Sequence, residues 1–337
     1  MIAEHLKRLA AGQNLSLEEA TAAFDLVMSG QCSEEEISAL LLGLREKGET
    51  VDEVAGAARS LRKHMTPVRT RRTGLVDTCG TGGDGSGTFN ISTAAAIVTA
   101  AAGVPVAKHG NRSISSRSGS ADVLAELGVN VEASVACVEQ CLDEIGICFC
   151  FAPHLHPAMK HVGSVRKKLG VPTVFNLLGP LCNPAQAPYQ VLGVGKPHLH
   201  RLMAEALARV GVERAVVVCG GDGLDEVTLS GPTTVLKIEN GEVHEFQWTP
   251  ANFGLEPAGR ETMLIDGPEA SAAMIRRVLD GEKGPPRDIV ILNAAAAIFI
   301  AGAAPTPRAA AEKAAEAIDN GAAKNLLTRF AELSHRT

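Results

Sequence analysis

Apolar and polar residues alternate with a helical period through the first 65 residues of the chain. The runs "LEEATAAFDLVM", "EEEISALLLGLREKG" and "VDEVAGAARSLRKHM" each gather apolar side chains on one face. Each run follows a capping-box pair, a hydroxyl residue three positions before a glutamate: Ser16 and Glu19, Ser33 and Glu36, Thr50 and Glu53. The pattern predicts a small helical domain over residues 1–70, followed by a linker around residues 66–74.

The pattern changes after Gly74, where strand-like apolar runs begin to alternate with helical ones. Strands are expected at "LVDTC", "VPVAKHG", "ICFCFA", "YQVLGVG", "RAVVVCGG" and "DIVIL", and helices between most of them. The stretch "TTVLKIENGEVHEFQW" reads as a hairpin that turns at Asn240 and Gly241. Residues 71–337 are therefore expected to form a larger α/β domain with a mostly parallel central sheet, and the end of the chain to be helical.

Composition and charge restrict the class of protein. The chain has 337 residues, of which 45% are hydrophobic and 21% charged, and its net charge of −6 argues against a broad nucleic-acid surface. It has neither an apolar run long enough for a bilayer nor a secretion signal, so a cytoplasmic protein without membrane contact is expected. Eight cysteines without a C-x-x-C pair favour a reducing compartment over a zinc site. The pairs His154/His156 and His198/His200 are interpreted as loop or surface histidines.

A glycine-rich loop, "DTCGTGGDGSGTFNIST", lies between a predicted strand and a predicted helix. Five of the eight residues from Gly80 to Gly87 are glycine, and Thr88, Asn90, Ser92 and Thr93 follow at the helix start. Bare backbone N–H groups at the positive end of a helix can bind a phosphate. The loop lacks the Walker pattern and fits G-x-G-x-x-G only loosely. A tight turn without a ligand is the alternative.

Two further loops follow predicted strands and carry charge. "KHGNRSISSRSGSAD" contains Lys108, Arg112, Arg117 and five serines, which suits phosphate oxygens, although a solvated loop would look alike. "GGDGLDEVTLSG" contains Asp225 and Glu226, and adjacent carboxylates suit Mg²⁺ held together with substrate phosphates; an exposed acidic turn is the alternative. Ligands of open α/β sheets bind at the carboxyl ends of strands, so the three loops together predict a site for a di- or polyphosphate with Mg²⁺.

The motifs "GTGGDGSGTFNIST", "VAKHGNRSISSRSGSADVLAELG", "FAPHLHPAMKHVGSVRKKLG", "TVFNLLGPLCNPA" and "DGLDEV" resemble, in order and spacing, those of the anthranilate phosphoribosyltransferase family. The resemblance runs from about residue 3 to 333, with Pro172 in place of an arginine common in the family. It implies a nucleoside phosphorylase/phosphoribosyltransferase-like fold, whose helical domain takes in about residues 166–185, and a homodimer formed through that domain. It also implies transfer of the phosphoribosyl group of phosphoribosyl pyrophosphate (PRPP) to anthranilate, in tryptophan biosynthesis.

The resemblance also assigns roles to residues of this chain. Asn111 and Arg166 would bind anthranilate, and Gly80 would lie near both substrates. One or two Mg²⁺ ions would be held by Ser92, Asp225 and Glu226. The residues that the resemblance assigns to PRPP binding are Gly80, Gly83, Asp84, Thr88, Asn90, Ile91, Ser92, Thr93, Lys108, His109, Gly110, Asn111, Arg112, Ser113, Ile114, Ser115, Ser116 and Ser120.

The sequence contains no recognisable nucleophile–base pair, so no catalytic residue is assigned, and His109 is expected to be a contact and not a base. Two rival interpretations remain at this point. One is a pyrimidine nucleoside phosphorylase, which would use inorganic phosphate and a nucleoside. The other is a nucleic-acid-binding relative without enzymatic activity, which would lack the glycine and acidic motifs and carry a basic surface.

Overall fold

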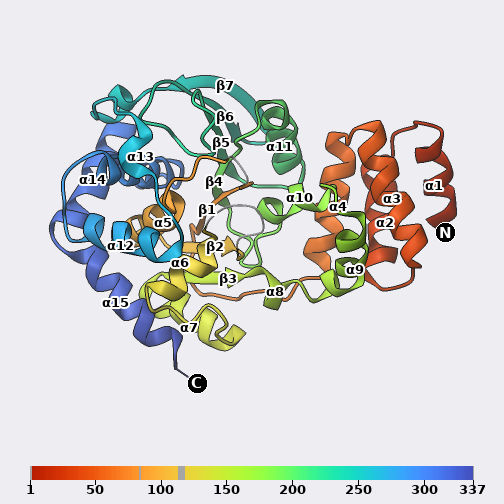
Figure 1. The fold of residues 1–337 in the computed structure, drawn as a ribbon, viewed down its shortest axis with the longest axis horizontal. Helices are drawn as coiled ribbons and strands as arrows, with labels where there is room; N and C mark the ends of the chain where they lie inside the picture. The colour runs from red at the N-terminus through yellow and green to blue at the C-terminus, as the bar shows by residue number, and fades with distance from the viewer. Residues whose placement is uncertain (1, 83–84, 113–117, 337) are drawn as a thin grey trace.

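The computed structural model describes residues 2–82, 85–112 and 118–336, which form two lobes (Figure 1). Four helices build most of the small lobe: α1 (Ile2–Ala10), α2 (Leu17–Met28), α3 (Glu34–Lys47) and α4 (Val51–Lys63). All three predicted capping boxes are present, at the starts of α2, α3 and α4. The helical prediction for this part of the chain is therefore confirmed.

A later segment of the chain completes the small lobe. It comprises η1 (Pro157–Met159), α9 (Lys160–Leu169), α10 (Phe175–Leu178) and η2 (Gly179–Leu181). Val162 and Val165 of α9 are buried in the same apolar core as the first four helices, and α9 packs against α2 and α3. The ring of Phe175 meets that of Phe24 edge-on, with centroids 5.8 Å apart. Apolar packing thus explains why α9 lies with the small lobe in Figure 1.

Seven strands of the described chain form one sheet in the large lobe, in the order β3-β2-β1-β4-β5-β6-β7. The first five strands are parallel and the last two antiparallel, as the sequence predicts. Asn240 and Gly241 both have positive φ, as a two-residue turn between paired strands requires. The strands are β1 (Val76–Gly80), β2 (Val106–Gly110), β3 (Ile147–Phe151), β4 (Tyr189–Gly193), β5 (Arg214–Gly220), β6 (Thr233–Glu239) and β7 (Glu242–Trp248).

Helices cover both faces of this sheet. On one face α5 (Ile91–Ala101) packs on β1 and β2, and α13 (Pro285–Ile300) packs on β4 and β5. On the other face α11 (Pro197–Arg209) covers β5 and β6 and also contacts α4 of the small lobe. The remaining elements surround these layers: α6 (Ser120–Glu126), α7 (Val135–Ile145), α8 (Ala152–Leu155), η3 (Pro250–Phe253), η4 (Arg260–Met263), α12 (Pro268–Leu279), α14 (Pro307–Asp319) and α15 (Ala322–Ser334).

The prediction of a strand at "DIVIL", residues 288–292, is wrong. These residues lie inside α13, a 16-residue helix that is buried over most of its length. A helix packed on several sides by apolar neighbours shows no polar face, so a short apolar run cannot separate it from a buried strand. Pro285 and Pro286 at its first turn are the local signal that favours a helix start.

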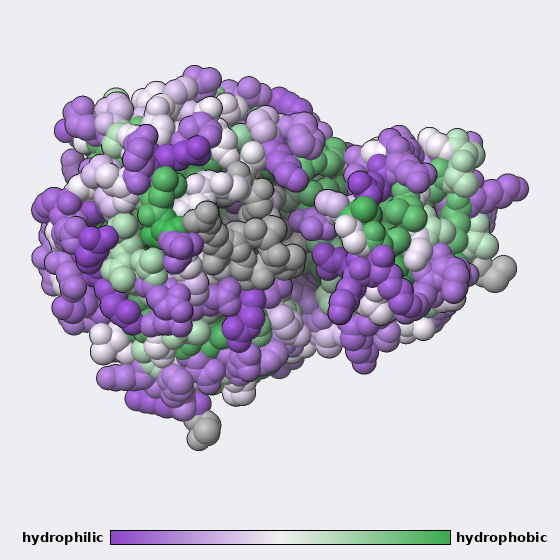
Figure 2. All heavy atoms as spheres, in the orientation of Figure 1, coloured by the Kyte–Doolittle hydropathy of each residue, from purple (hydrophilic) through white to green (hydrophobic). Residues whose placement is uncertain are grey.

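Arg62 of α4 joins the two lobes. Its Nε donates to the carbonyl oxygen of Leu181 at 2.6 Å, and its NH1 donates to that of Val210, at the end of α11, at 3.1 Å. Burial lowers the pKa of this guanidinium. Figure 2 shows the small lobe set against the large one across a narrower waist.

Glu53 ties α4 to the start of α2. The side chain is fully buried, and its Oε1 accepts from the backbone N–H of Leu15 at 2.9 Å. Its Oε2 accepts from the N–H of Thr50 at 2.8 Å and from Nζ of Lys47 at 2.9 Å. One carboxylate therefore serves as capping residue, as partner of an ion pair and as a link between two helices.

The substitution Glu53→Ala is expected to lower the free energy of unfolding by about 3 kcal/mol, because buried donors and a buried ammonium lose their acceptor. Glu36→Ala is the matched control, since Glu36 holds the same capping-box position on α3 at a more exposed site, and a loss of about 1 kcal/mol is expected. Urea unfolding measures both values. Equal losses would contradict a special role for the buried contacts.

Candidate active site

The three predicted loops meet beyond the carboxyl ends of β1, β2 and β5. The N–H of Gly82 donates to Oδ2 of Asp225 at 3.0 Å, and the N–H of Ser92 donates to Oε1 of Glu226 at 3.1 Å. Nζ of Lys108, at the end of β2, lies 3.3 Å from Oγ of Ser92. The glycine loop, the first turn of α5, the end of β2 and the acidic loop are thus brought together in space, as the sequence predicts.

Two glycines allow the acidic loop to lie against the sheet. A Cβ on Gly193, the last residue of β4, would overlap the carbonyl oxygen of Asp225. A Cβ on Gly80, the last residue of β1, would lie 2.5 Å from Oδ2 of the same aspartate. At Gly193 the overlap is with the main chain, so only glycine permits this path of the acidic loop; at Gly80 a side chain would force the Asp225 carboxylate to turn away from its position.

Asn90 connects the start of α5 to two other segments. Its N–H donates to Oγ of Ser271 at 2.9 Å, and Ser271 in turn donates to Oδ1 of Asn90 at 3.0 Å. Oγ of Ser118, in the loop of residues 108–122, donates to the same oxygen at 2.9 Å. Asn90 holds the N-cap position of α5, but its side chain makes no capping hydrogen bond and instead joins the start of α5 to Ser118 and Ser271.

The neighbours of Asn90 are packed against the core or against a later segment. Ile91 and Thr93 are buried, and Thr88 forms an isolated bridge with Leu264. Oγ of Ser92 accepts from Lys108. Ser92 alone of these four residues is in hydrogen-bond contact with both the acidic loop and β2.

The end of β2 is mostly enclosed. Lys108 is 3% exposed and donates to the carbonyl oxygen of Thr78 as well as to Ser92, and burial lowers the pKa of its amine. Nδ1 of His109 donates to the carbonyl oxygen of Gly179 at 2.9 Å. Gly110 has no room for a Cβ, which would meet Oγ of Ser120 and the ring of Phe149.

The two residues that follow Gly110 differ in their surroundings. Asn111 is exposed, and its carbonyl oxygen accepts from Oγ of Ser120 at 3.4 Å. Arg112 forms ion pairs with Asp122 at 3.3 Å and with Glu132 at 2.9 Å. The positive charge that Arg112 contributes to this loop is therefore partly neutralised. Six predicted site residues lie outside the described residues: Gly83, Asp84, Ser113, Ile114, Ser115 and Ser116.

Arg166 lies apart from these loops, on α9 of the small lobe. Its guanidinium covers the ring of Phe175 at 5.5 Å from the centroid, and partial burial lowers its pKa. The adjacent lysines differ from it, because Lys167 is exposed and Lys168 pairs with Glu34. No ion pair with a carboxylate of the described residues engages Arg166. The surroundings of Arg166 therefore distinguish it from Lys167 and Lys168, whereas the sequence pattern alone does not.

The donors at the acidic loop fit a magnesium ion. Asp225 and Glu226 offer carboxylate oxygens and Ser92 a hydroxyl, and Mg²⁺ uses one or two carboxylates together with substrate phosphates and water. Within residues 2–82, 85–112 and 118–336 no group of three or more His, Cys, Asp or Glu side chains could hold a metal by itself. The set thus suits an ion that arrives with a phosphate ligand.

The interpretation of these histidines as loop or surface residues is wrong for His200, which is buried on α11, whereas His156 lies in the loop between α8 and η1 but is enclosed. His156 and His200 are buried, at 5% and 6% exposure. Nε2 of His156 lies 3.0 Å from Nε2 of His109, and Nε2 of His200 bonds the carbonyl oxygen of Val217 at 2.9 Å. Spacing along the chain did not reveal these contacts, because each partner comes from a distant segment.

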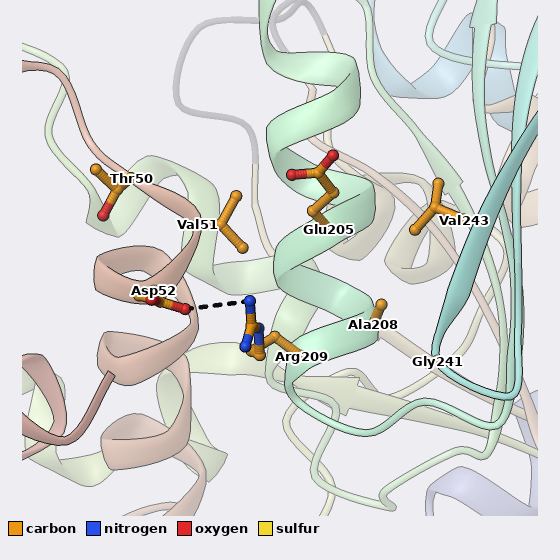
Figure 3. A pocket seen from close by; sticks show the side chains of 8 residues that line it. All are labelled: Thr50, Val51, Asp52, Glu205, Ala208, Arg209, Gly241 and Val243. Atoms are coloured by element: carbon orange, nitrogen blue, oxygen red, sulfur yellow. Dashed lines mark ion pairs between the residues drawn. The ribbon is translucent and has the colours of Figure 1, made fainter. Parts of the chain in front are cut away.

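A groove of about 590 Å³ lies elsewhere, between the N-terminus of α4, α11 and the β6–β7 turn. Asp52 and Arg209 form an ion pair across it at 3.5 Å, and Glu205 and Val243 line its other side (Figure 3). It contains none of the predicted site residues. The candidate site is therefore defined by the three loops and not by this groove.

Several side chains that shape the site were not predicted. Asn293 of α13 is buried; its Oδ1 accepts from the N–H of Val227, and its Nδ2 donates to the carbonyl oxygen of Val227, both at 2.9 Å. Ser271 and Asp77 make comparable contacts to Asn90 and to His109. Their roles depend on contacts with segments far away in the sequence, and the sequence carries no local signal for them.

Comparisons with known proteins bear on the same regions. Residues 72–324 match the α/β domain of a glycosyl transferase family, and residues 3–65 match the helical bundle domain of a glycosyl transferase family. The anthranilate phosphoribosyltransferase of Rhodopirellula baltica is 50% identical over 321 residues, which cover 95% of this chain and 94% of that protein.

Solved structures agree with the sequence comparison. Anthranilate phosphoribosyltransferase from Thermus thermophilus superimposes with a TM-score of 0.91 at 44% identity, covering 98% of this chain and 99% of the other. The enzyme from Saccharomyces cerevisiae, in complex with PRPP and Mg, gives a TM-score of 0.89 at 31% identity and covers 99% and 97%. The chain therefore belongs to the anthranilate phosphoribosyltransferase family.

Proposed function

We propose that this chain transfers the phosphoribosyl group of PRPP to the amine of anthranilate, giving N-(5-phosphoribosyl)anthranilate and pyrophosphate. The observation that carries the proposal is the meeting of the glycine loop, the end of β2 and the acidic pair at one edge of the sheet. The same edge offers backbone N–H groups for phosphate and carboxylates for a cation. The reaction would be an early step of tryptophan biosynthesis.

The donor side of the site would be built from the glycine loop, residues 108–116 and Ser120. Displacement at the anomeric carbon of the ribose builds positive charge on the ring while negative charge grows on the pyrophosphate. Ser92, Asp225 and Glu226 would hold Mg²⁺, which when bound neutralises charge on the leaving group. One or two ions are compatible with this donor set. The relative from S. cerevisiae supports the proposal, since its structure contains PRPP and Mg.

The acceptor side would use Asn111 and Arg166. A guanidinium can bind the carboxylate of anthranilate with two parallel hydrogen bonds. Partial burial against Phe175 makes such a pair stronger than one in open solvent. Since Arg166 lies on the small lobe and Asn111 on the large one, the acceptor would lie between the lobes.

An aromatic amine is unprotonated at neutral pH, so its attack needs no strong base. The histidines near the site agree with this view. Because the Gly179 carbonyl can only accept, Nδ1 of His109 carries the proton, and Nε2 accepts from Nε2–H of His156. Burial lowers the pKa of His109 to about 3 and that of His156 to about 4. Both rings are neutral at pH 7, and holding the two substrates in line would supply most of the rate enhancement.

Several further properties belong to the same proposal. Residues 1–70 would be the helical domain, joined by about residues 166–185, and residues 71–337 the α/β domain. The protein would form a homodimer through its helical domain and act in the cytoplasm, without nucleic acid or membrane as partner. Its eight cysteines are all free thiols, which supports a reducing compartment. No helix of the described residues has the length and apolar character needed to cross a bilayer.

The first test follows anthranilate consumption by fluorescence with purified protein, PRPP and Mg²⁺. Signal loss that requires all three components is expected. Asp225→Asn should lower kcat/KM about 100-fold, because the leaving group loses charge stabilisation. Asp280→Asn, a surface aspartate paired with Lys324, is the control and should stay within about twofold. Phosphorolysis of thymidine or uridine by folded protein that leaves anthranilate untouched would refute the proposal and favour a nucleoside phosphorylase.

The role of Arg166 is tested by Arg166→Ala beside Lys167→Ala. The arginine variant should raise the KM for anthranilate about 30-fold, because a charge-assisted bidentate contact is lost, and leave the KM for PRPP nearly unchanged. The exposed Lys167 on the same helix should have little effect on either constant. Steady-state kinetics with each substrate varied in turn gives the answer. An equal rise in both KM values would exclude a specific acceptor contact.

The buried histidines predict a loss of stability in acid. The pKa of His156 is lowered from 6.5 to about 4, so the unfolded state binds more protons between these pH values, and stability falls as pH is lowered through them. His156→Gln should remove on the order of 1–2 kcal/mol of the difference in unfolding free energy between pH 7 and pH 5. His154→Gln, at an exposed position, is the control. Urea titrations at the two pH values would disprove the claim if both variants matched the wild type.

A further inference from the structure

Strands β1 and β2 pair over a shorter distance than their neighbours. Within the described chain they share one register pair, Val76 with Val106. In contrast, β1 pairs with β4 over five residues, and β2 pairs with β3 over five. The two strands therefore share fewer main-chain hydrogen bonds near the ends that carry the candidate site, although they remain side by side.

Side chains form hydrogen bonds with the backbone groups that the next pair of main-chain hydrogen bonds between β1 and β2 would use. In a parallel pair, alternate residues direct their N–H and C=O groups to the same neighbour, so after Val76 the rung would fall to Thr78, with Ala107 and His109 opposite. The Thr78 carbonyl oxygen instead accepts from Nζ of Lys108. The N–H of His109 donates to Oδ1 of Asp77 at 3.1 Å. The carbonyl oxygen of Ala107 accepts from Nδ2 of Asn183 at 2.8 Å.

Among these side chains, Asp77 is the one whose burial costs free energy. Its carboxyl group is fully buried, and its Oδ2 has no hydrogen-bond partner among the described residues. Burial raises its pKa. A main-chain rung would satisfy the His109 N–H without burying an ionisable group, so sheet pairing alone does not account for an aspartate here.

We infer that Asp77 is a positioning residue, which holds the backbone of residues 109–111 through the His109 N–H in place of a main-chain hydrogen bond from β1. The Thr78 carbonyl oxygen, which makes no main-chain bond to His109, accepts from Nζ of Lys108, and the same Nζ reaches Oγ of Ser92. The segment that Asp77 holds carries the His109 ring and Asn111. This inference rests on the proposed function, in which that segment contacts anthranilate.

The consequence for specificity follows from which segments Asp77 holds. The glycine loop is held independently of Asp77, through Gly82 and Ser92, by the acidic pair. Residues 109–111 also belong to the donor side, but PRPP would keep the glycine loop and the acidic pair, whereas on this lobe anthranilate would have Asn111 alone. Loss of the Asp77 side chain should therefore weaken acceptor binding more than donor binding. An asparagine keeps an oxygen that can accept from the His109 N–H, so it should restore much of what an alanine loses.

The test compares Asp77→Ala and Asp77→Asn with Thr99→Val, which removes a buried hydroxyl from the far end of α5. Hydrogen–deuterium exchange of the full chain without substrates reports on the His109 amide. We expect exchange about tenfold faster in Asp77→Ala and near wild type in the other two variants. The KM for anthranilate should rise about tenfold in Asp77→Ala, and that for PRPP by a smaller factor, because the glycine loop and the acidic pair still hold PRPP.

The outcomes separate the inference from the proposed function. Wild-type protein without transferase activity would refute the function, and the exchange data would still decide whether Asp77 holds β2. Unchanged exchange at His109 in folded Asp77→Ala would overturn the positioning role, as would an Asp77→Asn variant as impaired as the alanine one. If Asp77→Ala fails to fold, Asp77→Ser replaces it. The serine hydroxyl is too short to reach the His109 amide, so the same changes in exchange and in KM are expected.

Discussion

The close approach of the acidic loop to the ends of β1 and β4 is the constraint on which the rest of the site depends. Gly80 and Gly193 leave no room for a side chain, and Asp225 fills the space they provide. The carboxylates of Asp225 and Glu226 then reach the backbone of the glycine loop and of α5. Two missing Cβ atoms thus allow the loop after β5 to be held by the loop after β1, although 143 residues separate Gly82 from Asp225.

The features that could be predicted from the sequence are those encoded by residues close together along the chain. The capping boxes and the alternation of apolar and helical runs depend on neighbouring residues, and they predict the helical lobe and all seven strands of the described sheet. The apolar run in α13 was misread, since burial removes the polar face that distinguishes a helix. Asp77 and Asn293 act on backbone groups of distant segments, and Arg166 stands out only once Phe175 is packed beneath it. Such roles arise from tertiary contacts, which no short motif encodes.

The two lobes are joined by contacts of unequal strength. Arg62 is buried and binds two carbonyl oxygens, whereas the pair of Asp52 and Arg209 lies at the edge of an open groove (Figure 3). Hydrogen bonds from a buried charged donor are stronger than a solvated ion pair. Arg62 therefore contributes more to holding the two lobes together than the ion pair of Asp52 and Arg209 does.

The open edge of the sheet has a consequence for how the protein behaves at high concentration. The two edge strands of the sheet differ: β3 is buried along its whole length, whereas β7 is largely exposed. An unprotected margin of this kind can recruit a strand from another molecule and start aggregation. Glu242, His244 and Glu245 place polar and charged side chains along β7. These residues make the growth of an intermolecular sheet unfavourable, so solubility is secured at a part of the fold far from the chemistry.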